Sequence, residues 1–136
     1  MNRIPSRGSP FHEWIESEPW KRFKSVGLTG LKGSSKAYLL SLWMEKGQGP
    51  LLIITPSLQK AESLAEDLQF FSPESQDDVV LFPPWETLPY DEIPPHPEII
   101  RERVNGLFSL LHERGVVIVS PIQALMQKVL SPSDLE

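Results

Sequence analysis

Cysteine is absent from the 136-residue sequence. Its absence excludes disulfides, zinc–thiolate sites and thiol nucleophiles, and it fits a protein of the reducing cytoplasm. The sequence also lacks the run of about 18 apolar residues that a membrane span requires, and its N-terminus has no apolar signal core. The length suits one domain with a real core. We therefore expect a soluble, untargeted, cytoplasmic protein without membrane contact.

Basic residues are scarce outside the N-terminal third. Residues 1–36 carry seven Lys and Arg against three Asp and Glu, a net charge of +4, whereas residues 37–136 carry six against fifteen, a net charge of −9. Because duplex binding relies on clustered Lys and Arg, most of this surface should repel DNA. A DNA-binding module in the N-terminal third stays an alternative, although an ordinary solvated face explains its charge more simply.

Four short β-rich runs lie at residues 26–29, 51–55, 79–82 and 116–120. The last three are continuously apolar, which is typical of strands covered on both faces in a parallel sheet. Helical patterns follow at 36–46, after Ser57, from Pro97 toward Gly115, and after Ser120-Pro121. A further helical stretch at 9–24, interrupted by Pro19, should pack against the sheet. The pattern predicts an α/β fold with a parallel sheet flanked by helices.

Residues 28–37 have the outline of a phosphate-binding loop, G-x-x-x-x-G-K-[ST], whose amides surround phosphates and whose final hydroxyl binds Mg²⁺. Gly30 and Lys36 fit that outline, but Ser35 replaces the second glycine and Ala37 replaces the hydroxyl residue. None of the three continuous runs ends in the acidic residue that Mg²⁺ also needs. We interpret the stretch as a degenerate phosphate loop without turnover, in which Lys36 could still hold an anion. Its residues are Gly30, Gly33, Ser34, Ser35, Lys36 and Ala37.

Residues 83–97 contain six prolines and should form a rigid, extended connection. Its aromatic and acidic side chains form a possible interaction surface, since exposed aromatic residues ringed by acids are common anchors; these are Trp85, Glu86, Leu88, Tyr90 and Asp91. The alternative is that the apolar members fold back on the sheet. Arg101 and Arg103, beside Glu98 and Glu102, are expected to form solvated ion pairs. The scattered His12, His96 and His112 predict no metal site.

Several of these strings together resemble one known family. They are Pro84-Trp85-Glu86-Thr87-Leu88-Pro89-Tyr90-Asp91, Pro95-His96-Pro97-Glu98-Ile99-Ile100 with Arg103, Arg114-Gly115-Val116-Val117-Ile118-Val119-Ser120-Pro121, and Leu125-Met126-Gln127. They resemble the start of the bacterial transcription-repair coupling factors (Mfd), and the likeness runs from about Leu28 to Leu130. The W-E-T-L-P-Y-D string is its most specific part.

The resemblance implies a UvrB-like, helicase-like domain of the RecA-like or P-loop NTPase type, in which the phosphate loop has decayed. It implies a helical segment at 1–25, this domain at 26–130, and at 131–136 the start of a linker to a UvrA-docking module that follows. The segment from Tyr90 to Glu98 is too short for the damage-probing hairpin of UvrB, so damage probing should be lost as well. We therefore expect a fragment of a longer protein.

By the same resemblance, the function would be a non-catalytic scaffold in nucleotide excision repair, without catalytic residues, metal or cofactor. The parent would be an ATP-dependent DNA translocase that binds RNA polymerase and DNA, and its other domains would contact this one. UvrA would be the partner, through the following module. A nucleotide-binding helicase or ATPase domain stays the alternative function.

Overall fold

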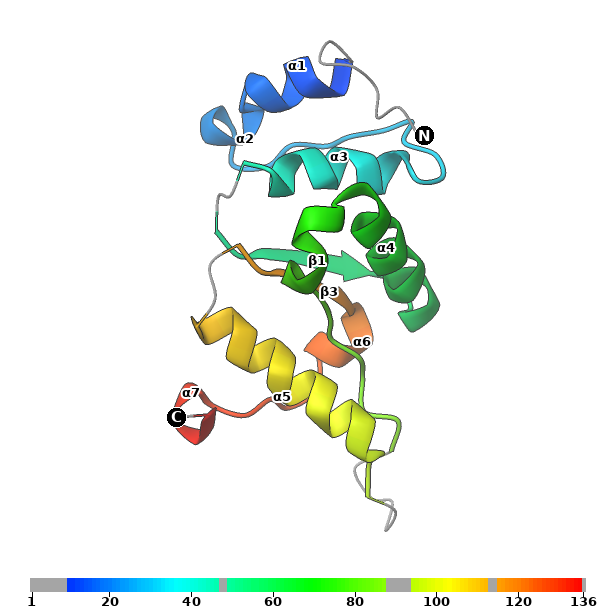
Figure 1. The fold of residues 1–136 in the computed structure, drawn as a ribbon, viewed down its shortest axis with the longest axis vertical. Helices are drawn as coiled ribbons and strands as arrows, with labels where there is room; N and C mark the ends of the chain where they lie inside the picture. The colour runs from blue at the N-terminus through cyan, green and yellow to red at the C-terminus, as the bar shows by residue number, and fades with distance from the viewer. Residues whose placement is uncertain (1–9, 47–48, 88–93, 113–114, 136) are drawn as a thin grey trace.

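A three-stranded parallel sheet lies in the middle of the molecule (Figure 1). The computed structural model describes residues 10–46, 49–87, 94–112 and 115–135. Its strands are β1 (Leu51–Thr55), β2 (Val79–Leu81) and β3 (Val117–Pro121), in the order β1-β3-β2. In the register, Val117 of the central strand lies between Leu51 and Val79. The predicted α/β class and parallel sheet are confirmed.

Helices cover the two faces of this sheet unequally. Helix α4 (Leu58–Phe71) packs against all three strands on one face, while α5 (Pro97–His112) contacts β2 and the short α6 (Ile122–Leu125) contacts β3. The central strand is buried along its whole length, as its unbroken apolar sequence predicts. The same prediction is wrong for β1, an edge strand in which Leu52 and Ile54 are 52% and 54% exposed. Helix α5 lies close to β2 because it has Gly106 at the contact, where an added Cβ would lie 3.1 Å from the Phe82 ring.

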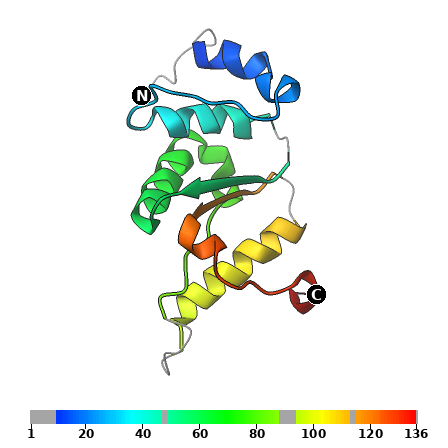
Figure 2. The ribbon, with the colours of Figure 1, turned by 180° about the vertical axis from the view of Figure 1, so that it is seen from behind.

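The N-terminal helices do not pack on the sheet, contrary to prediction. Helices α1 (Pro10–Glu16) and α2 (Pro19–Arg22) lie over α3 (Ser35–Met44), which separates them from the strands (Figures 1 and 2). Trp20 stacks on Trp43 of α3 with ring centroids 4.3 Å apart, and Trp14 meets Trp20 edge-on. These aromatic contacts hold α1 and α2 on α3, since aromatic side chains bury large apolar areas when they pack together. The predicted break at Pro19 is confirmed.

The predicted strand at residues 26–29 is wrong. These residues form an irregular segment, in which the side chains of Val26 and Leu28 are 41% and 45% exposed. The preference of Val for strands depends on burial against neighbouring strands, and no strand of the described residues pairs with this segment. Gly27 further weakens it, since glycine offers no side chain for packing.

The predicted helix ends agree with the structure at three positions and disagree at one. Ser57 caps α4 by accepting a hydrogen bond from the Lys60 amide, Pro97 is the first residue of α5, and Gly115 takes a left-handed φ of 87° where the chain turns toward β3. Ser120 does not cap the next helix. Its hydroxyl donates to the Phe82 carbonyl instead, and α6 is only four residues long, so Val129 lies beyond it.

Candidate functional site

The loop before α3 turns back on itself. Gly30 and Gly33 have φ values of 83° and 53°, in the left-handed region that glycine adopts without strain. The Ser35 amide donates to the Lys32 carbonyl at 3.2 Å, and the Ser35 hydroxyl donates to the same oxygen at 2.6 Å. The amide and the hydroxyl of Ser35 therefore both bond within the loop. A phosphate-binding loop would need a free amide and no side chain at this position.

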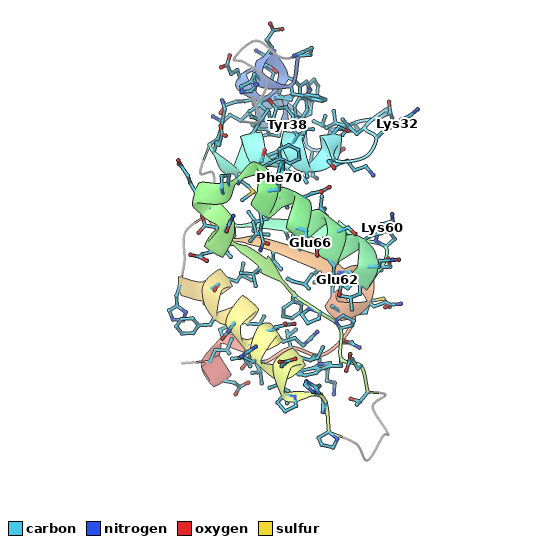
Figure 3. The ribbon with its side chains drawn as sticks, turned by 45° about the vertical axis from the view of Figure 1, so that its right-hand side comes forward. Lys32, Tyr38, Lys60, Glu62, Glu66 and Phe70 are labelled. Atoms are coloured by element: carbon cyan, nitrogen blue, oxygen red, sulfur yellow. The ribbon has the colours of Figure 1, made fainter. Side chains whose placement is uncertain are left out.

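The two residues after Ser35 differ in burial. Lys36 is exposed, whereas Ala37 is fully buried in the main core cluster with Ala61, Leu68 and other apolar residues of α4, β2 and β3. Lys32 also projects outward from the loop (Figure 3). Position 37, where the motif places its magnesium hydroxyl, thus has an apolar environment that would not solvate a cation.

The segment that enters the loop also differs from a phosphate-binding site. Such a site places its loop between a strand and a helix, so that the sheet fixes the loop under the phosphates. In this chain the loop is followed by α3, but the preceding residues 26–29 are irregular. The assignment of Gly30, Gly33, Ser34, Ser35, Lys36 and Ala37 to a degenerate phosphate loop stays a prediction.

Polar residues at the carboxyl ends of the strands bond to the backbone. The hydroxyl of Thr55 donates to the Ser57 carbonyl at 2.9 Å, and that of Ser120 donates to the Phe82 carbonyl at 3.1 Å. Both side chains are buried. They fix the turns that leave β1 and β3. Among the described residues, no group of three or more His, Asp or Glu side chains gathers as a metal site would require.

The proline-rich segment is fixed at Trp85. Gln127 accepts a hydrogen bond from the Trp85 amide at 2.7 Å and donates one to the Trp85 carbonyl at 3.3 Å. Trp85 is half-buried, while Glu86 is exposed. Leu88, Tyr90 and Asp91, the other members of the predicted interaction surface, lie outside the described residues.

Arg103 is the functional candidate that sequence reasoning missed. The prediction of a solvated ion pair is wrong for this residue, because it is only 2% exposed. Its guanidinium donates to the carbonyls of Pro83, at 2.6 Å, and Lys128, at 3.4 Å. The same group lies 4.3 Å from the ring centroid of Phe82 and 4.5 Å from that of Trp85. Burial lowers the pKa of Arg103 from its ordinary value.

The position of Arg103 in the helical pattern indicates that it faces the sheet. Arg103 lies four residues before Leu107 and three before Gly106, on the side of α5 that faces the sheet. A long side chain can bury its stem and stack its planar head on aromatic rings. Arg101, two positions earlier, is exposed, but among the described residues it forms no ion pair with Glu98 or Glu102, so only the solvated part of that prediction is confirmed.

Comparison with known proteins identifies the family. Over 100 residues, or 74% of the chain, the sequence is 39% identical to the transcription-repair-coupling factor of Haemophilus influenzae. Over 106 residues, or 77% of the chain, it is 38% identical to that of Escherichia coli. The chain belongs to the transcription-repair coupling factor family. The factor of Myxococcus xanthus is 30% identical over 90% of the chain. No protein-family model matches the sequence.

The chain corresponds to a small part of these relatives. It covers 8%, 9% and 10% of the coupling factors from Haemophilus influenzae, Escherichia coli and Myxococcus xanthus, respectively. The resemblance read from the W-E-T-L-P-Y-D string and its companions is therefore confirmed as a match to one region of the family. No helix in the described part of the chain is long and apolar enough to cross a membrane.

Proposed function

We propose that this chain is a non-catalytic scaffold of transcription-coupled DNA repair, a UvrB-like module with a helicase-like ancestry. Its role would be to hold a following UvrA-docking module in a fixed orientation and to pack against other domains of a larger translocase. The family match supports the repair context, since its relatives are transcription-repair-coupling factors. UvrA, RNA polymerase and DNA would be partners of that larger protein.

One observation carries the non-catalytic part of this proposal. The side chain at position 37 is fully buried in the hydrophobic core, at the position where a working phosphate loop presents a hydroxyl to Mg²⁺. Phosphoryl transfer depends on that metal and on a positioned water. Because the residue is used for packing, the loop serves the fold. The exposed Lys36 could at most attract an anion to the start of α3.

The scaffold role is tested by capture of purified UvrA. One bait is this chain, and the second is a chimera in which the chain continues into the segment that follows the matched region of the Escherichia coli relative. We expect UvrA to bind the chimera and not the chain alone, because the docking module is proposed to follow. A matched chimera with Glu62→Ala, at an exposed position of α4 in the present chain, should bind equally well. If neither bait retains UvrA, the proposed scaffold role is wrong.

A further inference from the structure

Two segments far apart in the sequence bond to each other and to the same helix, α5. The first runs from Phe82 to Thr87 after β2, and the second runs from Met126 to Leu130 after α6; we call them the tryptophan segment and the exit segment. Gln127 of the exit segment bonds to both the amide and the carbonyl of Trp85. The side-chain amide thus pairs with Trp85 as a neighbouring strand would.

Arg103 of α5 forms hydrogen bonds to the same two segments. One guanidinium nitrogen donates to the Pro83 carbonyl in the tryptophan segment, and another donates to the Lys128 carbonyl in the exit segment. Phe82 and Trp85 lie against the guanidinium with their rings. A planar group with several fixed donors can make these contacts simultaneously, which a lysine could not.

Hydrophobic burial alone does not explain these contacts, because they include a buried charge and directed hydrogen bonds. A buried charge is costly unless hydrogen bonds and aromatic faces offset the loss of water. The chain places this charge where it bonds to one carbonyl from each segment, and it adds Gln127 as a second link between them. Neither link involves a residue of the loop before α3, so this feature is separate from the degenerate phosphate loop.

We infer that Arg103 and Gln127 form a clamp that makes the tryptophan segment and the exit segment move as one unit on α5. A partner that binds the tryptophan segment would then alter the direction in which the chain leaves after α6, and a load on the exit segment would alter the tryptophan segment. Such coupling is reciprocal by thermodynamic necessity. The inference depends on the contacts alone and would hold even if the scaffold function were wrong.

The absence of cysteine makes a direct test possible, because introduced cysteines are the only sites for spin labels. One pair of labels at Glu62→Cys and Glu86→Cys reports on the tryptophan segment, and a second pair at Glu62→Cys and Lys128→Cys reports on the exit segment. Glu62 lies on the outer face of α4, which packs on the sheet (Figure 3). Pulsed electron double resonance then gives the distribution of each distance.

We expect one narrow distance peak for each pair in the parent chain and loss of both narrow peaks in Gln127→Met, which removes both bonds to Trp85 at similar volume. Arg103→Lys should have the same effect. The matched control is Gln123→Met, since Gln123 is exposed on α6, and it should leave both peaks narrow. Broad peaks in the parent, or loss of no peak or only one in Gln127→Met, would overturn the inference. Gln127→Met decides alone if Arg103→Lys fails to fold.

Discussion

Ala37 shows how one residue can fit the outline of a motif and serve a different purpose. The sequence marked it as anomalous, because a hydroxyl belongs at that position of a phosphate loop. The structure adds that its methyl group is fully buried against α4 and the sheet, while Lys36 beside it is exposed. Periodicity alone could not show this, since the helix that begins at Ser35 is apolar around most of its circumference.

Restoring the missing hydroxyl should therefore damage the fold. Ala37→Thr adds volume and a polar group to a packed core, and we expect it to lower the free energy of unfolding by about 1–3 kcal/mol. Lys36→Thr is the matched control, because it places the same residue on the same helix at an exposed position. We expect it to lower the free energy of unfolding by only about 0.5 kcal/mol. Urea denaturation followed by circular dichroism measures both. Equal stability of the two variants would show that position 37 is not packed as described.

Arg103 was misjudged for an equally local reason. Glu98 and Glu102 precede it on the same helix, so charge spacing alone favoured solvated ion pairs. The aromatic rings that lie against it come from residues about 20 positions earlier in the chain, and helical periodicity cannot reveal such contacts. Residue spacing along one helix predicts contacts within that helix. It does not predict which side chains of another segment pack against it.

Truncation of this side chain should be costly. Arg103→Ala leaves a cavity between Phe82 and Trp85 and removes hydrogen bonds to two carbonyls, so we expect a loss of about 2–4 kcal/mol in the free energy of unfolding. The exposed Arg101 provides the comparison: Arg101→Ala should change stability by less than about 0.5 kcal/mol. Chemical denaturation of the two variants side by side is the measurement. Losses of similar size would contradict the buried position of Arg103.

At the scale of elements, the sequence predicted the strands but not the burial of each one, since β3 is buried throughout whereas Leu52 and Ile54 of β1 are exposed. The runs at 51–55, 79–82 and 116–120 were recognisable as strands because their apolar residues are continuous, and α4 and α5 were recognisable by their caps and stripes. The run at 26–29 has similar residues, but strand formation needs a neighbouring strand, which composition does not reveal. The packing of α1 and α2 on α3 depends on tryptophans from three separate helices, so their position was not predictable either.

The N-terminal cap of α4 gives a test at this scale. Ser57 accepts a 3.4 Å hydrogen bond from the Lys60 amide, which is long for such a bond. Ser57→Ala should therefore cost about 0.5–1 kcal/mol, toward the low end for caps. Ser63→Ala, an exposed position in the middle of the same helix, should be neutral or slightly stabilising. Thermal unfolding of both variants measures the difference, and a more stable Ser57→Ala would show that the serine does not cap the helix.

A carboxylate bonds to the residue before the last helix, α7 (Pro132–Leu135). The Asp134 side chain accepts bonds from the Ser131 hydroxyl, at 2.6 Å, and the Ser131 amide, at 3.1 Å, and these bonds lower the pKa of Asp134 below its ordinary 3.8. A lowered pKa means that the stabilisation is complete above pH 3.8 and is lost as the pH falls through the folded value.

An NMR titration of the Ser131 amide follows this helix end directly. We expect its chemical shift to change with a midpoint below pH 3.8, and we expect Asp134→Asn to abolish that transition. A midpoint at or above pH 3.8 in the parent chain would mean that the Ser131 bonds do not hold the ionised carboxylate.

For the whole molecule, the family match supports the repair context of the proposed role. The sheet and α4 form one body, α1 and α2 extend it on the far side of α3, and the exit segment crosses α5 before α7 (Figures 1 and 2). The repair context came from a specific string of residues and was confirmed by the match to coupling factors. Composition and hydropathy alone would have given only an acidic α/β domain. The helicase-like ancestry stays a prediction.

The most direct measurement is titration of the chain with Mg-ATP in a calorimeter, with phosphate release followed in the same sample. Because position 37 is packed into the core and Ser35 bonds within its own loop, we expect no saturable heat at micromolar nucleotide and no phosphate release above that of buffer. Lys36→Ala is the matched control and should behave identically. Micromolar binding together with release of phosphate that Lys36→Ala abolishes would contradict the account of this domain as a non-catalytic scaffold.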